Sequence, residues 1–456
     1  MAEYDVLVIG SGSGMTIASN AVASKLKTAV IEHGPMGGTC LNRGCIPSKM
    51  LLYPADIIAM IKEAEKLGID ITINSIDFKK IMNRMRHLVT EDSQQQGKAV
   101  EVTDKIVWYK GTGEFISDYT MQIGDHRILA EKIFIVSGAR PGVPPIKGIK
   151  EVNYLTSETL LELKEPPQDI IVIGGGYIAA EYGHFFASIG TKVTIVQRNP
   201  ELIPKEEPEI SELLKEEMEK RMNIFTNHAV VEVEEKNNIK TVIAKNRETE
   251  ELKEFSAQSL LLATGRVPNS DLVKPEKTGV ELDKRGYVKV NEYLETNKKN
   301  IWALGDAIGK QMFKHVANYE AEVAWHNAIH EHKVALDYTA VPHAVFSHPQ
   351  IASVGFTEAK AKEQGYKIWV GKEYYENTGK GAAMGNPKGF VKVIVEQETG
   401  KILGGHIIGP FAPILIQEII NAMSKDNNFM NIIRSMHIHP AMPEVVQRAF
   451  SNLKET

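Results

Sequence analysis

One strand-and-glycine pattern occurs twice in this chain and constrains its fold more than any other feature. Residues 5–12 are DVLVIGSG and residues 169–176 are DIIVIGGG, and small residues follow each of them. An apolar strand that leads through a glycine-rich turn into a helix is typical of a nucleotide-binding βαβ unit. Each copy is followed by a second apolar run ending in a similar turn, at residues 133–141 and 260–268. The repetition predicts two copies of one nucleotide-binding domain.

The C-terminal part of the chain has a different pattern. From residue 340 onward, strands with alternating residues are expected at residues 390–397 and 402–409, and helices follow them. This order predicts a separate α+β domain. We therefore expect an α/β fold with two Rossmann-like nucleotide-binding domains and a C-terminal α+β domain. The expected boundaries are residues 1–146 and 267–338 for the two parts of the first nucleotide-binding domain, 147–266 for the second, and 339–456 for the C-terminal domain.

Charge and hydropathy exclude several classes of partner. The formal net charge of −5 over 456 residues gives no basic footprint for nucleic acid or for an anionic membrane. The N-terminus, MAEYDVLVIGSG, lacks the basic and long apolar regions of a signal peptide. No apolar run approaches the roughly 18 residues that span a bilayer. We expect a cytoplasmic protein that binds neither nucleic acid nor membrane.

The only two cysteines, Cys40 and Cys45, lie five positions apart in GGTCLNRGCIPSK, residues 37–49. Helical residues five apart have Cα atoms roughly 8.6 Å apart, whereas a disulfide needs less than about 7 Å. Gly44 permits unusual backbone angles, and Pro47 fits only the first turn of a helix. A distorted backbone here would allow a redox-active pair, which suits a reducing cytoplasm. Unrelated thiols or half a zinc site are the alternatives, but no second cysteine pair completes a metal shell, so no metal is expected.

The first glycine turn has the composition of a dinucleotide-binding turn. Gly10 and Gly12 permit close approach of the backbone to a pyrophosphate at a helix N-terminus. Glu32 ends the next apolar strand, about 20 residues further on, where a carboxylate accepts hydrogen bonds from ribose hydroxyls. Met15 occupies the position of the third glycine, although Gly14 precedes it. A tight turn without a ligand is the alternative.

The second turn carries information about the nicotinamide cofactor. Gly174, Gly176 and Ala179 fit GxGxxA, and the strand that follows ends in Gln197 and Arg198. A carboxylate at residue 197 would favour an unphosphorylated ribose, whereas a neutral amide followed by an arginine favours a 2′-phosphate. The pair therefore favours NADPH over NADH. The alternative, that Arg198 is an ordinary surface residue, stays open.

Near the C-terminus, HIHPAMPE places His439 five residues before Glu444. Two prolines stiffen the connection. A histidine held in one tautomer by a carboxylate is the base that a thiol needs, because the thiolate is the reactive species. The segment is a candidate acid–base site for the cysteine pair.

These motifs together resemble the FAD-dependent pyridine nucleotide–disulfide oxidoreductases of the glutathione reductase and dihydrolipoamide dehydrogenase type. The resemblance covers essentially the whole chain: GGTCxNxGCxPSK, both glycine turns, ATGRxPN, the Gly-Asp turn and HPxxxE. CLNxGCIPSK and HxHP are similar to dihydrolipoamide dehydrogenase. GSGSG, YIAAE, KHVANYEAE and HPAMPEVV resemble mycothione reductase more closely.

The resemblance implies a role for each site residue. Cys40 would exchange with substrate, and Cys45 would lie beside the flavin. Lys49 would lie near the flavin N5 and pair with Glu181, while Tyr177 would cover the nicotinamide pocket. The remaining contacts to FAD would be Gly10, Gly12, Gly14, Glu32 (adenosine ribose), Gly38, Thr39, Ser137, Gly138, Asp306 (ribityl chain), His315 and Ala317. Those to NAD(P) would be Gly174, Gly176, Ile178, Gln197, Arg198 and Gly265.

The resemblance also implies an assembly and a reaction. His439, oriented by Glu444, would act at Cys40 of the other subunit of an obligate homodimer built by the C-terminal domain. Electrons would pass from NAD(P)H through FAD to a Cys40–Cys45 disulfide and then to a low-molecular-weight disulfide. The reverse reaction, dihydrolipoamide oxidation by NAD⁺ in a 2-oxoacid dehydrogenase or glycine cleavage complex, is the alternative. A flavin-binding sensor with an idle site would lack some of these groups, and all are present.

Arg43 departs from the family pattern, which usually has a small apolar residue at this position. A cation beside Cys40 would lower the pKa of the thiol or attract an anionic substrate. The alternative is that Arg43 points to solvent.

Overall fold

The computed structural model describes residues 1–456 and divides the chain into two compact units. The first unit contains residues 1–50, 82–142 and 265–337, and the second contains residues 51–81, 143–264 and 338–456. Two long helices, α3 (Cys45–Glu63) and α4 (Phe78–Glu101), continue from one unit into the other. The domain boundaries expected from the sequence stay predictions.

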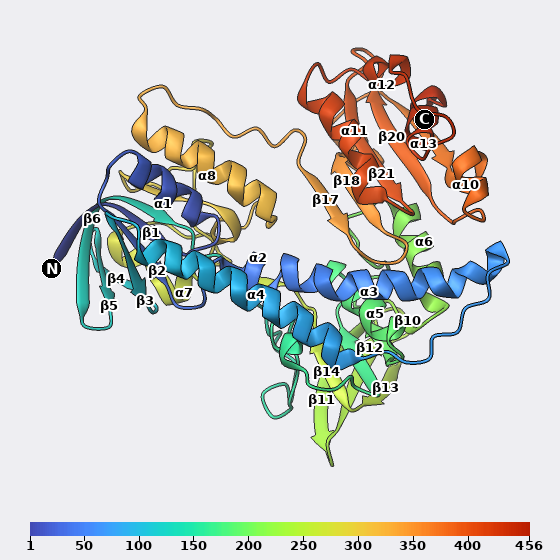
Figure 1. Cartoon of the computed structure of the whole chain (residues 1–456), viewed down its shortest axis with the longest axis horizontal. Coiled ribbons are helices and arrows are strands. Elements are labelled where there is room, and N and C mark those ends of the chain that lie inside the picture. Colours follow the sequence, from blue (N-terminus) through green and yellow to red (C-terminus); the bar gives the residue numbers. More distant parts are fainter. The chain divides into compact units, whose positions relative to one another are not determined.

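A seven-stranded sheet forms the centre of the first unit (Figure 1). Its path is β3-β2-β1-β6-β5-β4, and β16 pairs with β6. β1 is parallel to β2 and β6, with Val6 opposite Thr28 and Lys132. The strands are β1 (Ala2–Ile9), β2 (Thr28–Glu32), β3 (Ile106–Lys110), β4 (Glu114–Ser117), β5 (Thr120–Ile123), β6 (His126–Ile135) and β16 (Ile301–Ala303). The run VLVI of β1 is wholly buried, as expected for a parallel strand covered on both faces.

Helices and short elements complete this unit. α1 (Gly14–Ala23) packs on β1 and against α8 (Lys314–Ile329), and Figure 1 shows the two helices together. α8 is tied to the turn that precedes it, because Glu320 is fully buried and accepts a hydrogen bond from the Gly305 amide at 2.6 Å. The other elements are α2 (Gly38–Arg43), β7 (Ala139–Pro141), β15 (Arg266–Pro268), α7 (Ser270–Val273), η3 (Pro275–Thr278) and η4 (Gly305–Ala307).

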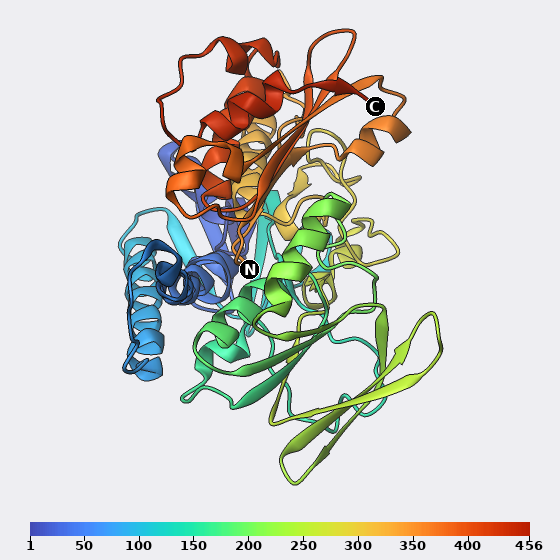
Figure 2. The ribbon, with the colours of Figure 1, turned by 90° about the vertical axis from the view of Figure 1, so that its right-hand side faces the viewer.

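The second copy of the predicted pattern forms a four-stranded parallel sheet of order β10-β9-β8-β14 in the second unit. A three-stranded antiparallel sheet, β11-β12-β13, follows β10, and Figure 2 shows its long hairpins in green and yellow. The sequence pattern did not predict this sheet. The elements are η2 (Thr159–Glu162), β8 (Asp169–Ile173), α5 (Tyr177–Ser188), β9 (Lys192–Val196), α6 (Pro208–Glu219), β10 (Asn223–Phe225), β11 (His228–Lys236), β12 (Ile239–Asn246), β13 (Leu252–Ala257) and β14 (Ser259–Leu262).

The C-terminal α+β region is built on a six-stranded sheet of order β17-β18-β21-β20-β19-β22. Apolar side chains of α11 and α13 pack on it in one core cluster. The remaining elements of the second unit are η1 (Ala64–Leu67), β17 (Pro342–Val345), β18 (Ile351–Gly355), α9 (Glu358–Glu363), β19 (Ile368–Tyr374), η5 (Tyr375–Asn377), α10 (Gly379–Ala383), β20 (Phe390–Glu396), β21 (Ile402–Ile408), α11 (Ala412–Ser424), α12 (Met430–Arg434), α13 (Glu444–Ser451) and β22 (Lys454–Glu455).

The alternating pattern of β20 and β21 does not leave one face of the sheet exposed. Both strands are buried on both faces except at the end of β20. The polar face of β20 is buried because Lys392, 4% exposed, forms ion pairs with Glu207, Glu209 and Glu358 at 2.7–3.0 Å. Paired charges allow a polar residue to be buried at this position. The polar residue in the alternating sequence of β20 therefore belongs to an internal ion-pair network.

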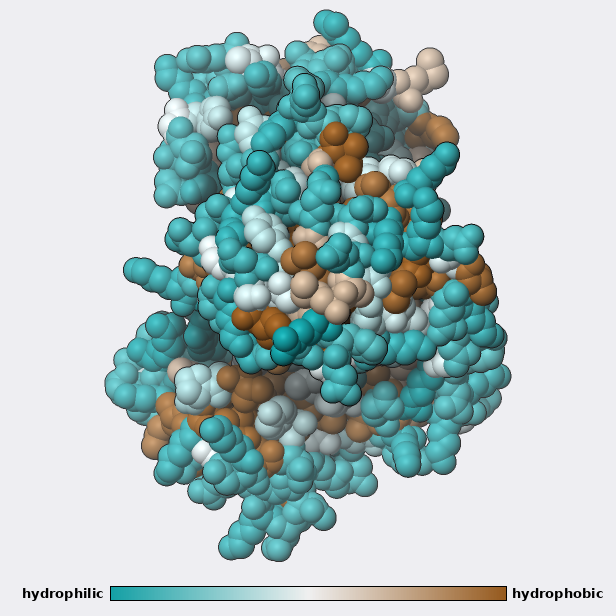
Figure 3. All heavy atoms as spheres, turned by 90° about the vertical axis from the view of Figure 1, so that its left-hand side faces the viewer, coloured by the Kyte–Doolittle hydropathy of each residue, from teal (hydrophilic) through white to brown (hydrophobic).

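Most of the surface in Figure 3 is hydrophilic, with scattered apolar residues. One helical stretch, Gly38–Leu67, has a mean hydropathy of 1.2 and is long enough to cross a membrane by length and composition only. The sequence analysis expected no such stretch. The core helix of a soluble protein can have the same length and composition. Of the most apolar 18 residues of this stretch, 39% are buried. The single stretch is weak evidence for a membrane span.

Candidate active site

The two cysteines come together because the helix breaks between them. α2 ends at Arg43, Gly44 has φ −137° and ψ −109°, and α3 begins at Cys45 with Pro47 in its first turn. A Cβ on Gly44 would lie 3.0 Å from the Thr39 carbonyl oxygen, so the chain folds back tightly on α2. Both cysteines are thiols in this structure. The two side chains share a hydrogen bond, so they lie close together. The break at Gly44 is the backbone distortion that the sequence predicted.

The charge that acts on the cysteine pair is that of Lys314, at the start of α8. The hydrogen bond with Cys45 and burial raise the pKa of the Cys40 thiol, and the Lys314 ammonium opposes this rise. Burial lowers the pKa of Lys314, while both sulfurs raise it. Sequence analysis noted Lys314 only within the KHVANYEAE motif and gave it no role. The signal that could have indicated a role for it was a lysine at the first position of the helix after the Gly-Asp turn.

Arg43 is directed toward Gly34, two residues after the end of β2. A Cβ on Gly34 would lie 3.2 Å from an Arg43 guanidinium nitrogen and 3.5 Å from Glu32 Oε1. The guanidinium therefore lies near Glu32, at the end of β2. Whether Arg43 also acts on Cys40 stays a prediction.

The first glycine turn forms a tight, hydrogen-bonded loop. Glu32 is 8% exposed and accepts hydrogen bonds from the Ser11 amide at 2.9 Å, the Ser11 hydroxyl at 2.8 Å and the Gly34 amide at 2.8 Å. A Cβ on Gly38 would lie 2.7 Å from the Gly12 Cα, so the glycine turn touches the start of the cysteine helix. The two predicted motifs therefore meet in one place.

Gly14 provides the close helix–strand packing that the third glycine of such a turn usually provides. A Cβ on Gly14 would lie 2.6 Å from Val8 Cγ1, so glycine allows α1 to pack closely on β1. Met15 is half-buried and packs against the core of this unit. Close packing of helix on strand is the purpose of the third glycine in a dinucleotide-binding turn. The departure at Met15 therefore leaves the geometry of the turn intact.

Two polar groups nearby, a half-buried carboxylate and a buried hydroxyl, suit a polar ligand. The Asp306 carboxylate lies 3.5 Å from Arg266 Nε, and burial raises the pKa of Asp306. The Ser137 hydroxyl is buried without a hydrogen-bond partner. Buried polar groups normally have partners, so a buried hydroxyl and a poorly compensated carboxylate indicate a missing ligand. Both fit the hydroxyls of FAD, and the close glycine turn fits its phosphates.

The remaining residues expected at FAD lie in the same unit. Thr39 precedes Cys40 on α2. Gly138 has φ +68°, and its carbonyl accepts from the Asn269 amide at 3.2 Å. His315 is exposed and stacks on Phe313 with ring centroids 5.6 Å apart. Ala317 lies against Gly305, next to Asp306.

The second glycine turn repeats the geometry of the first. Gly10 has φ +110° and its Cβ would lie 2.3 Å from the Val136 carbonyl oxygen. Gly174 has φ +115° and its Cβ would lie 2.3 Å from the Ala263 carbonyl oxygen. Only glycine adopts this backbone without strain. The equal geometry confirms that the repeat seen in the sequence is structural.

We expect Gly174→Ala and Gly176→Ala to separate folding from nucleotide binding. Alanine at 174 should lower the free energy of unfolding by at least about 1–2 kcal/mol, the cost of a left-handed alanine. A Cβ at Gly176 meets nothing within 4 Å, so alanine there should leave stability unchanged and weaken NADPH binding. Urea unfolding and nucleotide titration check both variants. Equal unfolding midpoints for the two would contradict the prediction.

At the end of β9, an amide side chain, Gln197, stands where the family pattern has a carboxylate, and two arginines lie close to it. Gln197 is 5% exposed, donates to the Glu201 carbonyl at 3.2 Å and covers Gly175, whose Cβ would lie 2.7 Å from it. Arg198 is exposed, and its carbonyl accepts a hydrogen bond from the Arg247 guanidinium at 3.1 Å. Arg247 follows β12, at the start of the turn to β13, and the sequence gave no signal for it.

The other residues expected at the nicotinamide lie on α5 or after β14. Tyr177 is 45% exposed at the start of α5, next to Ile178. Glu181 is buried and accepts a hydrogen bond from the Phe346 amide at 3.1 Å. Gly265 follows β14 with φ +103°. The pairing of Glu181 with Lys49 stays a prediction; Lys49 Nζ itself donates to the Ser48 hydroxyl at 3.3 Å.

His439 and Glu444 form the pair that their spacing suggested. His439 Nδ1 lies 2.9 Å from Glu444 Oε1, and the Ala441 amide donates to Glu444 Oε2 at 3.0 Å. The imidazole is 74% exposed, whereas the carboxylate is 10% exposed. The hydrogen bond from His439 lowers the pKa of Glu444 below its usual 4.5. The arrangement fixes one ring nitrogen and presents the other outward.

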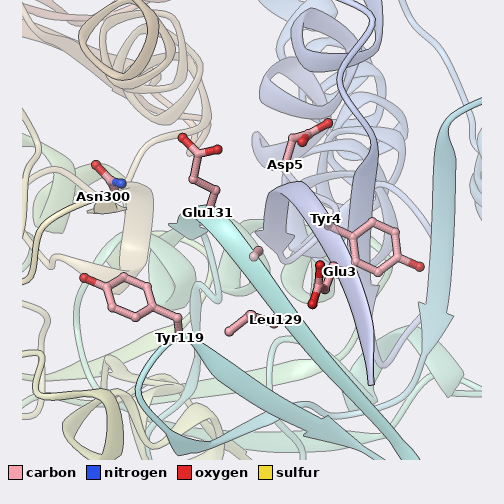
Figure 4. A pocket seen from close by; sticks show the side chains of 8 residues that line it. Glu3, Tyr4, Asp5, Tyr119, Leu129, Glu131 and Asn300 are labelled. Carbon is pink, nitrogen blue, oxygen red and sulfur yellow. The ribbon is translucent and has the colours of Figure 1, made fainter.

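A separate polar pocket lies at the opposite end of the first sheet (Figure 4). It contains the carboxylates of Glu3, Asp5 and Glu131. Glu3 and Asp5 are at the amino end of β1, whereas the glycine turn follows its carboxyl end. Ligands of open α/β sheets bind at the carboxyl ends of the strands. The pocket is therefore distinct from the redox site.

Comparisons with known proteins agree with this geometry. The family model of the pyridine nucleotide-disulphide oxidoreductases matches residues 4–331, and that of their dimerisation domain matches residues 341–450. The chain is 35% identical to a mycothione reductase of Mycobacterium tuberculosis, with 100% of both chains covered. It is 34% identical to a dihydrolipoyl dehydrogenase of Synechocystis, with 98% of both covered.

A solved structure of a flavoprotein disulfide reductase is also similar to this chain. The Cu(II) complex of the HOCl-induced flavoprotein disulfide reductase RclA from Escherichia coli superposes with a TM-score of 0.89 at 28% identity, covering 99% of both chains. The expected fold class and resemblance are confirmed. The chain belongs to the pyridine nucleotide–disulfide oxidoreductases, enzymes that use FAD and NAD(P)H.

Proposed function

We propose that this chain is a cytoplasmic, NADPH-dependent reductase of a low-molecular-weight disulfide and that it works as an obligate homodimer. The observation that carries the proposal is the end of β9, where the buried Gln197 is followed by the exposed Arg198, the Arg247 guanidinium donates to the Arg198 carbonyl, and residue 197 is not a carboxylate. Guanidinium groups bind phosphate through paired, charge-assisted hydrogen bonds. A 2′-phosphate fits this corner, and NADPH is the usual donor for reductive chemistry.

The chain's own residues would then carry out the disulfide exchange. When bound, FAD would supply the two-electron connection between nicotinamide and the sulfurs. The Cys40 thiolate attacks one sulfur of the substrate, the substrate S–S bond breaks, and the leaving thiolate takes a proton from the imidazolium of His439 of the partner subunit. The Cys45 thiolate then attacks Cys40 Sγ, the mixed disulfide breaks, the Cys40–Cys45 disulfide closes, and the second product leaves as a thiolate that takes its proton from solvent.

The outward ring of His439 supports this arrangement. Two apolar neighbours, Met436 and Ile438, are 99% and 80% exposed in the single chain. Large exposed apolar residues beside a catalytic motif suit a subunit interface. The dimerisation-domain match includes this segment.

The cofactor preference is tested by kinetics with NADPH and NADH in parallel. Arg198→Ala should raise the KM for NADPH about tenfold, and the double variant with Arg247→Ala about a hundredfold, because each charged hydrogen bond contributes about 1.5–3 kcal/mol. NADH kinetics should not change. Arg127→Ala, an exposed arginine on β6, is the matched control.

The substrate class is tested with a panel of lipoamide, glutathione disulfide, cystine, coenzyme A disulfide and mycothione-like disulfides. The proposal expects turnover of a small disulfide with NADPH. A preference for NADH together with fast lipoamide turnover would instead identify a dihydrolipoamide dehydrogenase, with a 2-oxoacid dehydrogenase or glycine cleavage complex as its partner.

A further inference from the structure

The ammonium of Lys314 lies in an unusual place for a lysine. Its Nζ donates to the Ser13 hydroxyl at 2.9 Å and to Asn318 Oδ1 at 2.6 Å. These acceptors are neutral oxygens, and Ser13 is 4% exposed. The Ser13 hydroxyl in turn donates to Asn318 Oδ1 at 2.9 Å. The lysine is therefore held in a fixed position while its charge is not neutralised by a carboxylate.

This fixed charge is attached to the glycine turn that touches the cysteine helix. Ser13 follows Gly12 in the glycine turn, and the turn touches Gly38 at the start of the helix that carries Cys40. The Lys314 charge accordingly acts on both sulfurs. Lys314 is also the first residue of the 16-residue α8, where the helix dipole adds positive potential.

Two other cations on the cysteine helices, Arg43 and Lys49, have contacts of their own. Arg43, on α2, lies against Gly34 near Glu32. Lys49, on α3, donates to the Ser48 hydroxyl. Lys314, from α8, is held by neutral acceptors, and its charge matches the negative charge that appears when the pair is reduced.

We propose that Lys314 is the electrostatic partner of the reduced cysteine pair and stabilises the thiolate that forms when its disulfide is opened. Reduction breaks the S–S bond with two electrons and two protons, and one thiol then releases its proton to solvent. The ammonium favours the charged sulfur, so a larger fraction of the pair is thiolate at neutral pH. The inference rests on the proposed redox role of the cysteines and is independent of which disulfide is the substrate.

The test measures thiol alkylation in the flavin-containing protein. The enzyme is reduced with dithiothreitol, freed of reductant under anaerobic conditions and treated with iodoacetamide at pH 5 to 10. Lys314→Met should alkylate about tenfold more slowly than wild type at neutral pH, equivalent to about one pKa unit. The rates should converge at high pH, where every variant is thiolate. Lys314→Arg should restore most of the rate, and Lys310→Met, an exposed lysine before α8, should not differ from wild type.

Asn318→Asp provides a second route if Lys314→Met folds poorly. This variant keeps the lysine and places a carboxylate beside its Nζ. Because the carboxylate would neutralise the ammonium, alkylation of the cysteines should slow as it does in Lys314→Met. The long-wavelength thiolate–flavin absorption of the reduced protein should weaken in both variants. A pH profile of Lys314→Met or Asn318→Asp that superimposes on wild type, with flavin content unchanged, would overturn the inference. A loss of alkylation rate in Lys314→Arg as large as in Lys314→Met would also overturn it.

Because alkylation needs neither nicotinamide nor disulfide substrate, failure of the proposed substrate or cofactor preference leaves this result interpretable.

Discussion

Cys45→Ser is expected to keep FAD and to lose NADPH-dependent disulfide reduction by about 10⁴-fold or more, the usual scale for removal of a covalent catalytic group. The serine hydroxyl fits the space of the thiol, and the polar groups assigned to FAD, Glu32, Ser137 and Asp306, are untouched. Without the second sulfur, however, the pair cannot form or reopen a disulfide. Flavin absorbance and steady-state turnover check the two halves of the prediction.

The control for this variant is Ser48→Ala, whose hydroxyl hydrogen bonds to the Cys45 carbonyl at 3.2 Å without taking part in sulfur chemistry. It should retain turnover. Cys40→Ser should be as inactive as Cys45→Ser, since each sulfur needs the other. Disulfide reduction that survives in Cys45→Ser would refute the exchange mechanism, whereas loss of flavin from that variant would refute the assumption that the FAD contacts are independent of the thiol.

His439→Gln is expected to lower disulfide turnover by about 10²–10⁴-fold, the range of a general acid–base group. NADPH-dependent bleaching of the flavin should be unchanged, because that step does not use the histidine. Glu444→Gln should cause a smaller loss, since it leaves the imidazole in place but removes the charge that orients it. Stopped-flow absorbance and turnover in parallel separate the two steps.

His437→Gln is the matched control, because His437 is a neighbouring histidine with its own carboxylate, Glu418, at 2.7 Å. It should retain turnover. The hydrogen bond from His439 holds the pKa of Glu444 below 4.5, so this carboxylate stays charged throughout the neutral range. Its stabilising contribution is lost only as the pH falls through that lowered pKa. Equal losses in His437→Gln and His439→Gln would contradict a specific acid–base role.

Much of the fold was predictable because its signals are local. The run VLVIG at residues 6–10 and its repeat at residues 170–174 each predicted a buried strand and a turn, and both turns have the same backbone geometry. The break at Gly44 followed from Pro47 and from the distance between the cysteines. The sheet β11-β12-β13 was missed, because its half-exposed hairpins have no glycine motif and resemble ordinary surface strands. The buried ion pairs of Lys392 on β20 could not be predicted, because its partners Glu207 and Glu209 lie more than a hundred residues away in the sequence.

The amino-acid sequence by itself determined the two nucleotide-binding turns, the cysteine pair and the His439–Glu444 pair, because each depends on residues a few positions apart whose backbone limits and chemistry are fixed by residue type. Only the tertiary structure decided which charges lie near those groups. Lys314 is more than 260 positions from either cysteine, and Arg247 is 49 positions from Arg198. Electrostatic interactions depend on distance in space, and that distance is set by how α8 packs on α1 and how β12 follows the parallel sheet.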